Sequence, residues 1–187
     1  MALSKVGLVD VTAITGETAL AATPATTDEF LINDGGTIKR IDASFMQNSA
    51  VSFGAKLASA QNVSNASNTV ITFDTEDWDN GADFDTSNNR FTCPEAGQYL
   101  FHARVYIEWG NAAGEIGRLQ LANGGTAVAI DAMTASGDPT SGSSLRITSI
   151  VNCDASINID VRLYHNQGAN QDADNDPDFT YFTGCKL

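Results

Sequence analysis

The longest alternating pattern in the sequence runs from Tyr99 to Trp109 and predicts a long β-strand with one buried face. Every second position is apolar: Tyr99, Phe101, Ala103, Val105, Ile107 and Trp109. The positions between them are mostly polar: Leu100, His102, Arg104, Tyr106 and Glu108. A period of two over eleven residues is typical of a strand that covers a core on one side and meets solvent on the other.

A turn is expected immediately before this strand, in the segment FTCPEAGQYLF. Pro94 presets one backbone angle and Gly97 accepts conformations that other residues avoid, so together they favour a chain reversal. Phe91, Tyr99 and Phe101 flank the turn and supply large aromatic area for a core. We interpret this segment as structural, with no role in chemistry.

Further strands are expected throughout the second part of the chain. They lie in VSFGAKLA, TVITFD, RLQLANGG, TAVAIDA, SLRITSIVN, INIDVRLYH and DFTYFTGCKL. In the last segment the predicted apolar face consists of Phe179, Tyr181, Thr183, Cys185 and Leu187, with Cys185 acting as a small core residue. About eight to ten antiparallel strands joined by polar turns predict an all-β sandwich or jelly roll. No convincing amphipathic helix or βαβ pattern competes with this interpretation.

The chain is expected to divide into an N-terminal arm, residues 1–48, and a jelly-roll domain, residues 49–187. The arm begins rich in Thr and Ala, and EFLINDGGTIKRI then predicts a β-hairpin around a Gly-Gly turn. An isolated hairpin is marginally stable in water, so we expect the arm to order itself against another chain. An unstructured leader is the alternative.

The segment Phe73–Val105 resembles the trimeric C1q/tumour-necrosis-factor-like jelly-roll family. The matching positions are Phe73-Asp74, Trp78 ahead of Asn80-Gly81, Phe84-Asp85, Phe91, Pro94, Gly97, Tyr99 and Phe101. The C-terminal TYFTGCKL is similar to the last strand of that family. The resemblance extends over roughly residues 50–187 and implies an antiparallel jelly roll that forms a homotrimer.

The arm resembles leaders of bacteriophage virion proteins, in which a Thr/Ala-rich segment precedes a D-G-G-T-x-K-x-I hairpin. This resemblance implies a structural virion protein (a fibre, spike or decoration protein) that binds capsid or tail proteins through its arm. Such a protein would be assembled in the host cytoplasm and located in the virion. It would adhere to host-surface glycans or stabilise the particle. The alternative is a non-viral soluble C1q-like recognition module that binds glycan or protein ligands.

Charge and cysteine content exclude several other classes. The net charge is −13 with only ten Lys and Arg residues, which disfavours nucleic acid as a partner. We find no signal peptide and no apolar run long enough for membrane insertion. Cys93, Cys153 and Cys185 are odd in number and lack a CxxC pair, so we expect three thiols that are not bridged to one another.

No catalytic residues are predicted, and the protein is not expected to be an enzyme. The two histidines, His102 and His165, lie outside any recognisable nucleophile or metal motif, and we interpret both as surface or hydrogen-bonded structural residues. A small hydrolase on a β-sandwich is the disfavoured alternative, because no site for it is visible.

Calcium is the one cofactor that the sequence suggests. Some relatives of this fold bind it near the trimer axis, and DAMTASGDPTSGSSL is similar to the loop involved, which makes Asp131 and Asp138 the preferred ligands. The second choice is the loop containing Asp172, Asp174, Asp176 and Asp178. Carboxylates are suitable ligands for this ion, but one pair cannot supply six to eight oxygens, so three copies would have to contribute. Solvated loop acids are the alternative for both sets.

Overall fold

The computed structural model describes residues 24–25, 27–43, 51–108, 114–135 and 142–187. The chain divides into two compact units, Met1–Asn48 and Ser49–Leu187. Each unit is β-structured, and no helix in the described ranges is long and apolar enough to cross a membrane.

The N-terminal unit contains the predicted hairpin. Strands β1 (Glu29–Asp34) and β2 (Thr37–Asp42) pair in antiparallel register around Gly35 and Gly36. Both glycines have positive φ angles, +58° and +86°, which a tight hairpin turn of this hand requires and which glycine adopts without strain. The hairpin leaves several apolar side chains exposed: Phe30, Leu31, Ile32 and Ile38.

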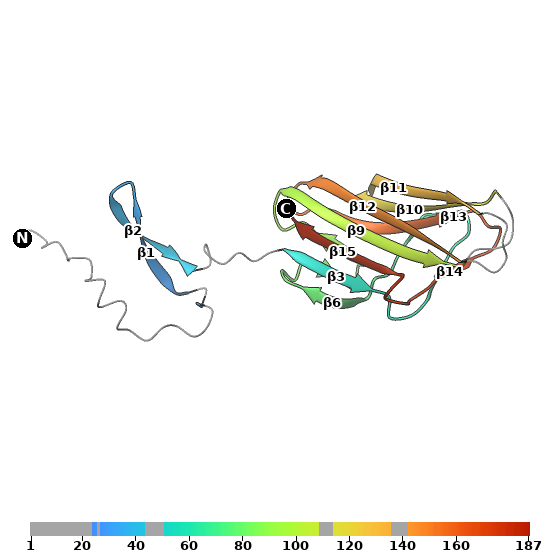
Figure 1. The fold of residues 1–187 in the computed structure, drawn as a ribbon, viewed down its shortest axis with the longest axis horizontal. Coiled ribbons are helices and arrows are strands. Elements are labelled where there is room, and N and C mark those ends of the chain that lie inside the picture. The colour runs from blue at the N-terminus through green and yellow to red at the C-terminus, as the bar shows by residue number, and fades with distance from the viewer. Residues whose placement is uncertain (1–23, 26, 44–50, 109–113, 136–141) are drawn as a thin grey trace, which may run out of the picture. The chain divides into compact units, whose positions relative to one another are not determined.

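The C-terminal unit is a sandwich of two antiparallel sheets (Figure 1). Sheet I has the order β4-β14-β9-β15-β3-β6, with β12 also paired to β9. Its strands are β3 (Ser52–Lys56), β4 (Gln61–Val63), β6 (Thr75–Asp79), β9 (Gly97–Ile107), β12 (Ser143–Cys153), β14 (Gln171–Ala173) and β15 (Tyr181–Lys186). Sheet II has the order β11-β10-β13-β8-β7, with β5 also paired to β13. Its strands are β5 (Thr69–Val70), β7 (Phe84–Asp85), β8 (Arg90–Thr92), β10 (Ile116–Asn123), β11 (Thr126–Thr134) and β13 (Asn158–His165).

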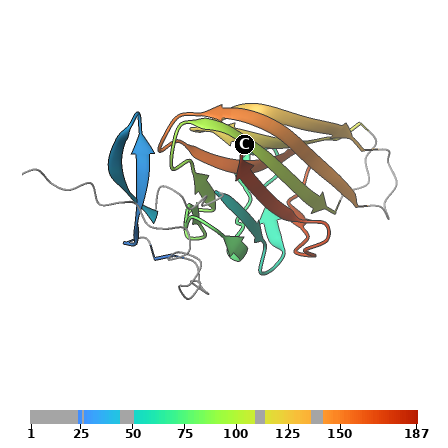
Figure 2. The ribbon, with the colours of Figure 1, turned by 60° about the vertical axis from the view of Figure 1, so that its left-hand side comes forward.

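The two sheets lie face to face, and Figure 2 shows the crossing of their long strands from a second direction. The described part of this unit contains the strands β3 to β15, more than the eight to ten expected. The excess consists of two- and three-residue strands such as β5 and β7, which are too short to show a period in the sequence. The all-β antiparallel sandwich is otherwise the predicted one.

Strand β9 confirms the alternating pattern at the centre of sheet I. Its apolar positions from Tyr99 to Ile107 are buried, whereas Trp109 lies outside the described residues. The Tyr99 hydroxyl donates a hydrogen bond to the Glu95 carbonyl oxygen at 2.9 Å, which fixes the preceding turn. The aromatic rings of Phe53 and Phe91 stack with centroids 4.7 Å apart, so both sheets contribute to one core.

The predicted apolar face of the last strand is wrong. In β15 the fully buried side chain is Phe182, whereas Tyr181, Thr183 and Cys185 are only half-buried and lie on the opposite face. A Cβ atom on Gly184 would lie 2.6 Å from the Phe101 ring, so only glycine fits beside Phe182 on the core side. Successive residues of a strand face opposite sides, and the buried Phe182 therefore places Tyr181, Thr183 and Cys185 on the outer side.

Candidate functional site

The outer face of sheet I differs in charge from the rest of the molecule. Three of its strands, β9, β12 and β15, point the following side chains away from the core: Leu100, His102, Arg104, Tyr106, Ser144, Arg146, Thr148, Ile150, Tyr181, Thr183 and Cys185. None of them is acidic, although the chain contains 23 Asp and Glu residues. We call this set the outer face.

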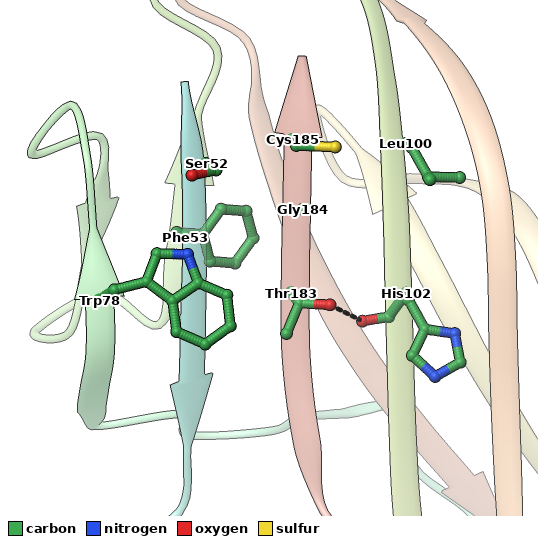
Figure 3. Close-up of a pocket in the computed structure, with 8 residues that line it drawn as sticks. All are labelled: Ser52, Phe53, Trp78, Leu100, His102, Thr183, Gly184 and Cys185. Carbon is green, nitrogen blue, oxygen red and sulfur yellow. Dashed lines mark hydrogen bonds between the residues drawn. The ribbon is translucent and has the colours of Figure 1, made fainter. Parts of the chain in front are cut away.

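A hollow of about 270 Å³ opens on the outer face (Figure 3). Its lining consists of Ser52, Phe53, Trp78, Leu100, His102, Thr183, Gly184 and Cys185. The Trp78 indole, 46% exposed, forms one wall by lying across Gly54 of β3. A Cβ atom on Gly54 would overlap the indole ring, so the glycine is what allows the ring to lie against the strand.

His102 connects the three strands of the outer face by hydrogen bonds. Its Nδ1 lies 2.6 Å from Thr148 Oγ1 on β12, and its Nε2 lies 2.9 Å from the Tyr181 hydroxyl on β15. Burial lowers the pKa of His102, and the positive charges of Arg146 and Arg104 lower it further. The ring is therefore neutral at pH 7 and connects two hydroxyl groups, in agreement with the hydrogen-bonded structural role predicted for it.

Two arginines lie side by side on the same face without a side-chain ion pair in the described part of the chain. Arg104 and Arg146 are direct cross-strand partners in the β9–β12 register. The Arg104 guanidinium donates to Ser144 Oγ at 3.2 Å and to the Asp178 carbonyl oxygen at 3.0 Å, and it lies 4.7 Å from the centroid of the Phe179 ring. Within the described ranges the ion pairs involve neither arginine. Like charges directly opposite one another are destabilising, so this pair favours an anionic group brought from elsewhere.

The second histidine is remote from the outer face. His165 is fully buried on β13 in sheet II, and its Nε2 lies 3.0 Å from the Val63 carbonyl oxygen. Because the two histidines belong to different sheets, the structure does not combine them into one site. The geometry of both is that of structural histidines.

The preferred calcium ligands are not brought together in the described part of the chain. Asp131 lies within strand β11, in agreement with the predicted strand TAVAIDA, and not in the loop that the family resemblance of DAMTASGDPTSGSSL implied. Its Oδ2 accepts a hydrogen bond of 2.9 Å from the backbone N–H of Arg146, on the edge of β12 that faces away from β9. Asp138 lies outside the described residues. The calcium site at these two residues stays a prediction.

The second set of acids mostly satisfies local backbone and side-chain donors. Asp172 lies on β14 and accepts a hydrogen bond from Asn62 Nδ2 at 2.9 Å. Asp174 accepts from the N–H of Asp176, and Asp176 accepts from the N–H of Asp178, both at 2.9 Å. Such side-chain to backbone bonds stabilise turns. Across the ranges that the structure describes, no group of three or more His, Cys, Asp or Glu residues is placed to hold a metal ion.

The three cysteines are free thiols, as predicted. Cys93 and Cys153 are buried, and Cys185 lines the hollow. The sequence analysis had missed the hollow and the arginine pair. Trp78 within an acidic segment was the only local signal for the hollow, and the arginine pair depends on pairing between strands that lie far apart in the sequence.

Comparison with known proteins identifies the C-terminal unit. Residues 52–184 match the family model described as the C1q domain. No curated protein matches the sequence. The similar solved structures include a tumour necrosis factor, Eiger, of S. frugiperda, with 14% identity, a TM-score of 0.55, and coverage of 74% of this chain and 91% of the other.

Two further structures share the fold. Murine APRIL, determined at pH 5.0, has 12% identity and a TM-score of 0.52 over 74% of this chain and 99% of the other. The globular domain of zebrafish complement 1qA has 14% identity and a TM-score of 0.51 over 74% of this chain and 97% of the other. At these identities the likeness establishes the fold alone.

Proposed function

The chain belongs to the C1q domain family, and we propose that it is a homotrimeric structural protein of a bacteriophage virion. C1q/tumour-necrosis-factor-like domains are trimeric modules and are typically ligand-binding rather than enzymatic. The observation that carries the proposal is the acid-free outer face, which offers a region where copies of a protein with net charge −13 can meet.

The matching surface of the next copy is an apolar edge of the sandwich. Val128 and Ile130 on β11 are 45% and 57% exposed. Strand β11 borders β12 at this edge, because Asp131 of β11 bonds to the backbone of β12. Packing the edge of one copy on the outer face of the next is a heterologous contact, and three such contacts close a ring.

The arm supplies the proposed anchor. Its hairpin exposes Phe30, Leu31, Ile32 and Ile38, and exposed apolar side chains on a two-stranded sheet favour docking against another protein. We assign this role to capsid or tail proteins of the particle, following the resemblance of the arm to phage leaders. The protein is then located in the virion after assembly in the host cytoplasm, and the jelly roll adheres to host-surface glycan or stabilises the particle.

Light scattering on the purified full chain tests the trimer. The expected mass is three times 19.7 kDa. A stable monomer at micromolar concentration contradicts the trimer without bearing on the location.

Mass spectrometry of purified phage particles tests the location. Full-length chain should be present, whereas a chain that starts at residue 49 should fold and be missing from the particles. If the full chain is also missing, the non-viral recognition module is the better explanation. If the shortened chain enters the particles equally well, the arm is not the anchor.

A further inference from the structure

Two buried thiols meet between the sheets of the jelly roll. Cys153 is the last residue of β12 in sheet I, and Cys93 directly follows β8 in sheet II. Both side chains belong to the common hydrophobic core and are at most 4% exposed. They therefore approach each other from opposite layers of the sandwich.

The backbone around the thiols explains why they meet. The N–H of Cys93 donates to the Ile157 carbonyl oxygen at 2.9 Å, and its own carbonyl oxygen accepts from the N–H of Ser156 at 2.7 Å. The short connection from Cys153 to Ile157 thus leads directly from one thiol to the backbone that pairs with the other. On the remaining side, Cys153 is the cross-strand partner of Gly97, where β9 begins.

The two thiols are close enough to affect each other's pKa, and the Cys153 thiol also donates to the Val151 carbonyl oxygen at 3.9 Å. Burial raises the pKa of Cys93, and a hydrogen bond between its thiol and that of Cys153 raises it further. Burial likewise raises the pKa of Cys153, whereas the hydrogen bond with Cys93 acts in the opposite direction. Thiols with raised pKa values form little thiolate, so they react slowly while the core is closed. Cys185 is not part of this contact, since it lies on the outer face.

We propose that Cys93 and Cys153 are an oxidative modification site that forms an intersheet disulfide once the protein enters an oxidising environment. The inference does not depend on the trimer or on the virion location. It agrees with both, however, because a virion protein folds in a reducing cytosol and acts outside the cell.

A small-molecule disulfide such as oxidised glutathione is a sufficient co-reactant. One protein thiol loses its proton and attacks the glutathione disulfide, which forms a mixed disulfide and releases one glutathione thiolate. The second protein thiolate then attacks the protein sulfur of the mixed disulfide and releases the second glutathione. Two protein thiols are oxidised, one glutathione disulfide is reduced to two glutathione thiols, and the protons pass to the released thiolates. Cys153 is the first attacker, because it borders the exposed turn residues Asp154 to Ser156.

The bond would join the two layers at one end of the sandwich and close a loop of 60 residues (153 − 93). Such a loop restricts the unfolded chain considerably, so the oxidised protein is expected to melt roughly 5–10 °C higher than the reduced protein. Both side chains already lie in the same core, at the ends of strands from the two sheets.

The test is equilibration of the reduced full-length protein with excess oxidised glutathione at pH 8.5. It is done both at 25 °C and at a temperature about 10 °C below the melting midpoint, where local opening admits the reagent. We expect a mass loss of about 2 Da, from two hydrogens. Peptide mapping should find Cys93 joined to Cys153, and the higher melting midpoint should return to its starting value with reductant.

Cys185→Ser is the matched control and should keep both the mass loss and the rise in melting midpoint. Cys93→Ser and Cys153→Ser should lose both. If either variant fails to fold, the peptide map of the wild-type protein decides alone. Three unbridged thiols after both incubations, a bridge that includes Cys185, or a lower midpoint on oxidation would each overturn the proposal.

Discussion

Replacing Gly54 by alanine is expected to displace the Trp78 indole from sheet I. The Cβ atom of the new side chain would overlap the six-membered ring, and Trp78 has solvent on its other side, so the indole is the group that moves. Gly54 does not adopt a positive φ angle, and alanine is compatible with a strand, so the backbone itself does not resist the change.

The cost follows from the area that Trp78 covers. The side chain is 46% exposed, and a fully buried tryptophan removes up to about 250 Å² from water. Roughly half of that area, at about 25 cal/mol per Å², corresponds to about 3 kcal/mol. Because unfolded chains already bury some of this surface, we expect Gly54→Ala to lower the free energy of unfolding by about 2–3 kcal/mol.

The assay is urea denaturation of Gly54→Ala, Trp78→Ala and the double variant. Trp78→Ala removes the ring, so the added methyl group no longer meets an obstacle, and the double variant should be about as stable as Trp78→Ala alone. Gly184→Ala is the contrasting control, because its Cβ atom would meet the buried rings of Phe101 and Phe53. If Gly54→Ala costs the same with and without Trp78, the indole is not what the glycine accommodates, and the argument fails.

Three further predictions concern His102, Arg146 and Asp131. The pKa of His102 is lower in the folded than in the unfolded protein. The stability that neutral His102 contributes is therefore present above the unfolded pKa of about 6.5 and is lost as the pH falls towards the folded pKa. Urea midpoints measured from pH 7.5 to 5.0 should fall less in His102→Asn than in wild type. Arg146→Glu should change the proportion of trimer measured by analytical ultracentrifugation. Arg118→Glu makes the same charge change at an exposed position on sheet II and should leave the proportion of trimer unchanged. Equal effects of the two variants would exclude the outer face as the contact region. Asp131→Ala should lower the free energy of unfolding by about 1 kcal/mol, because the Arg146 N–H loses its hydrogen-bond acceptor. If added calcium raises the melting midpoint of the wild type and not that of Asp131→Asn, Asp131 is also a calcium ligand. If calcium does not shift the wild-type midpoint, the calcium hypothesis is excluded.

The features that sequence reasoning predicted correctly depend on local patterns. Strand β9 has an unbroken apolar series on one side and a mostly polar series on the other, and its burial follows from the period of two. The Gly35-Gly36 turn similarly requires only two adjacent residues with positive φ angles. In both cases one consistent local signal determines the structure.

The incorrect predictions depend on residues that are distant in sequence. Strand β15 has aromatic residues on both faces, and the choice between Tyr181 and Phe182 is made by the rings that surround Gly184 in the folded core. The family resemblance placed Asp131 at the start of a calcium-binding loop, yet β11 continues to Thr134 because β10 pairs with it. The carboxylate fits there only because β12 offers an unpaired backbone donor.

The distribution of charge connects the fold with assembly. Copies that each carry a net charge of −13 repel one another, and this repulsion keeps the protein soluble but opposes a trimer. The outer face carries no acid on β9, β12 and β15, and it carries Arg104 and Arg146. The repulsion between copies is therefore lower at this face, where we propose that they touch. A carboxylate of the next copy would also relieve the repulsion between the two arginines, since neither forms an ion pair within the described part of the single chain. The same pair that is unfavourable in a monomer therefore becomes favourable in an oligomer, which would give the surface its preference for another copy of the chain.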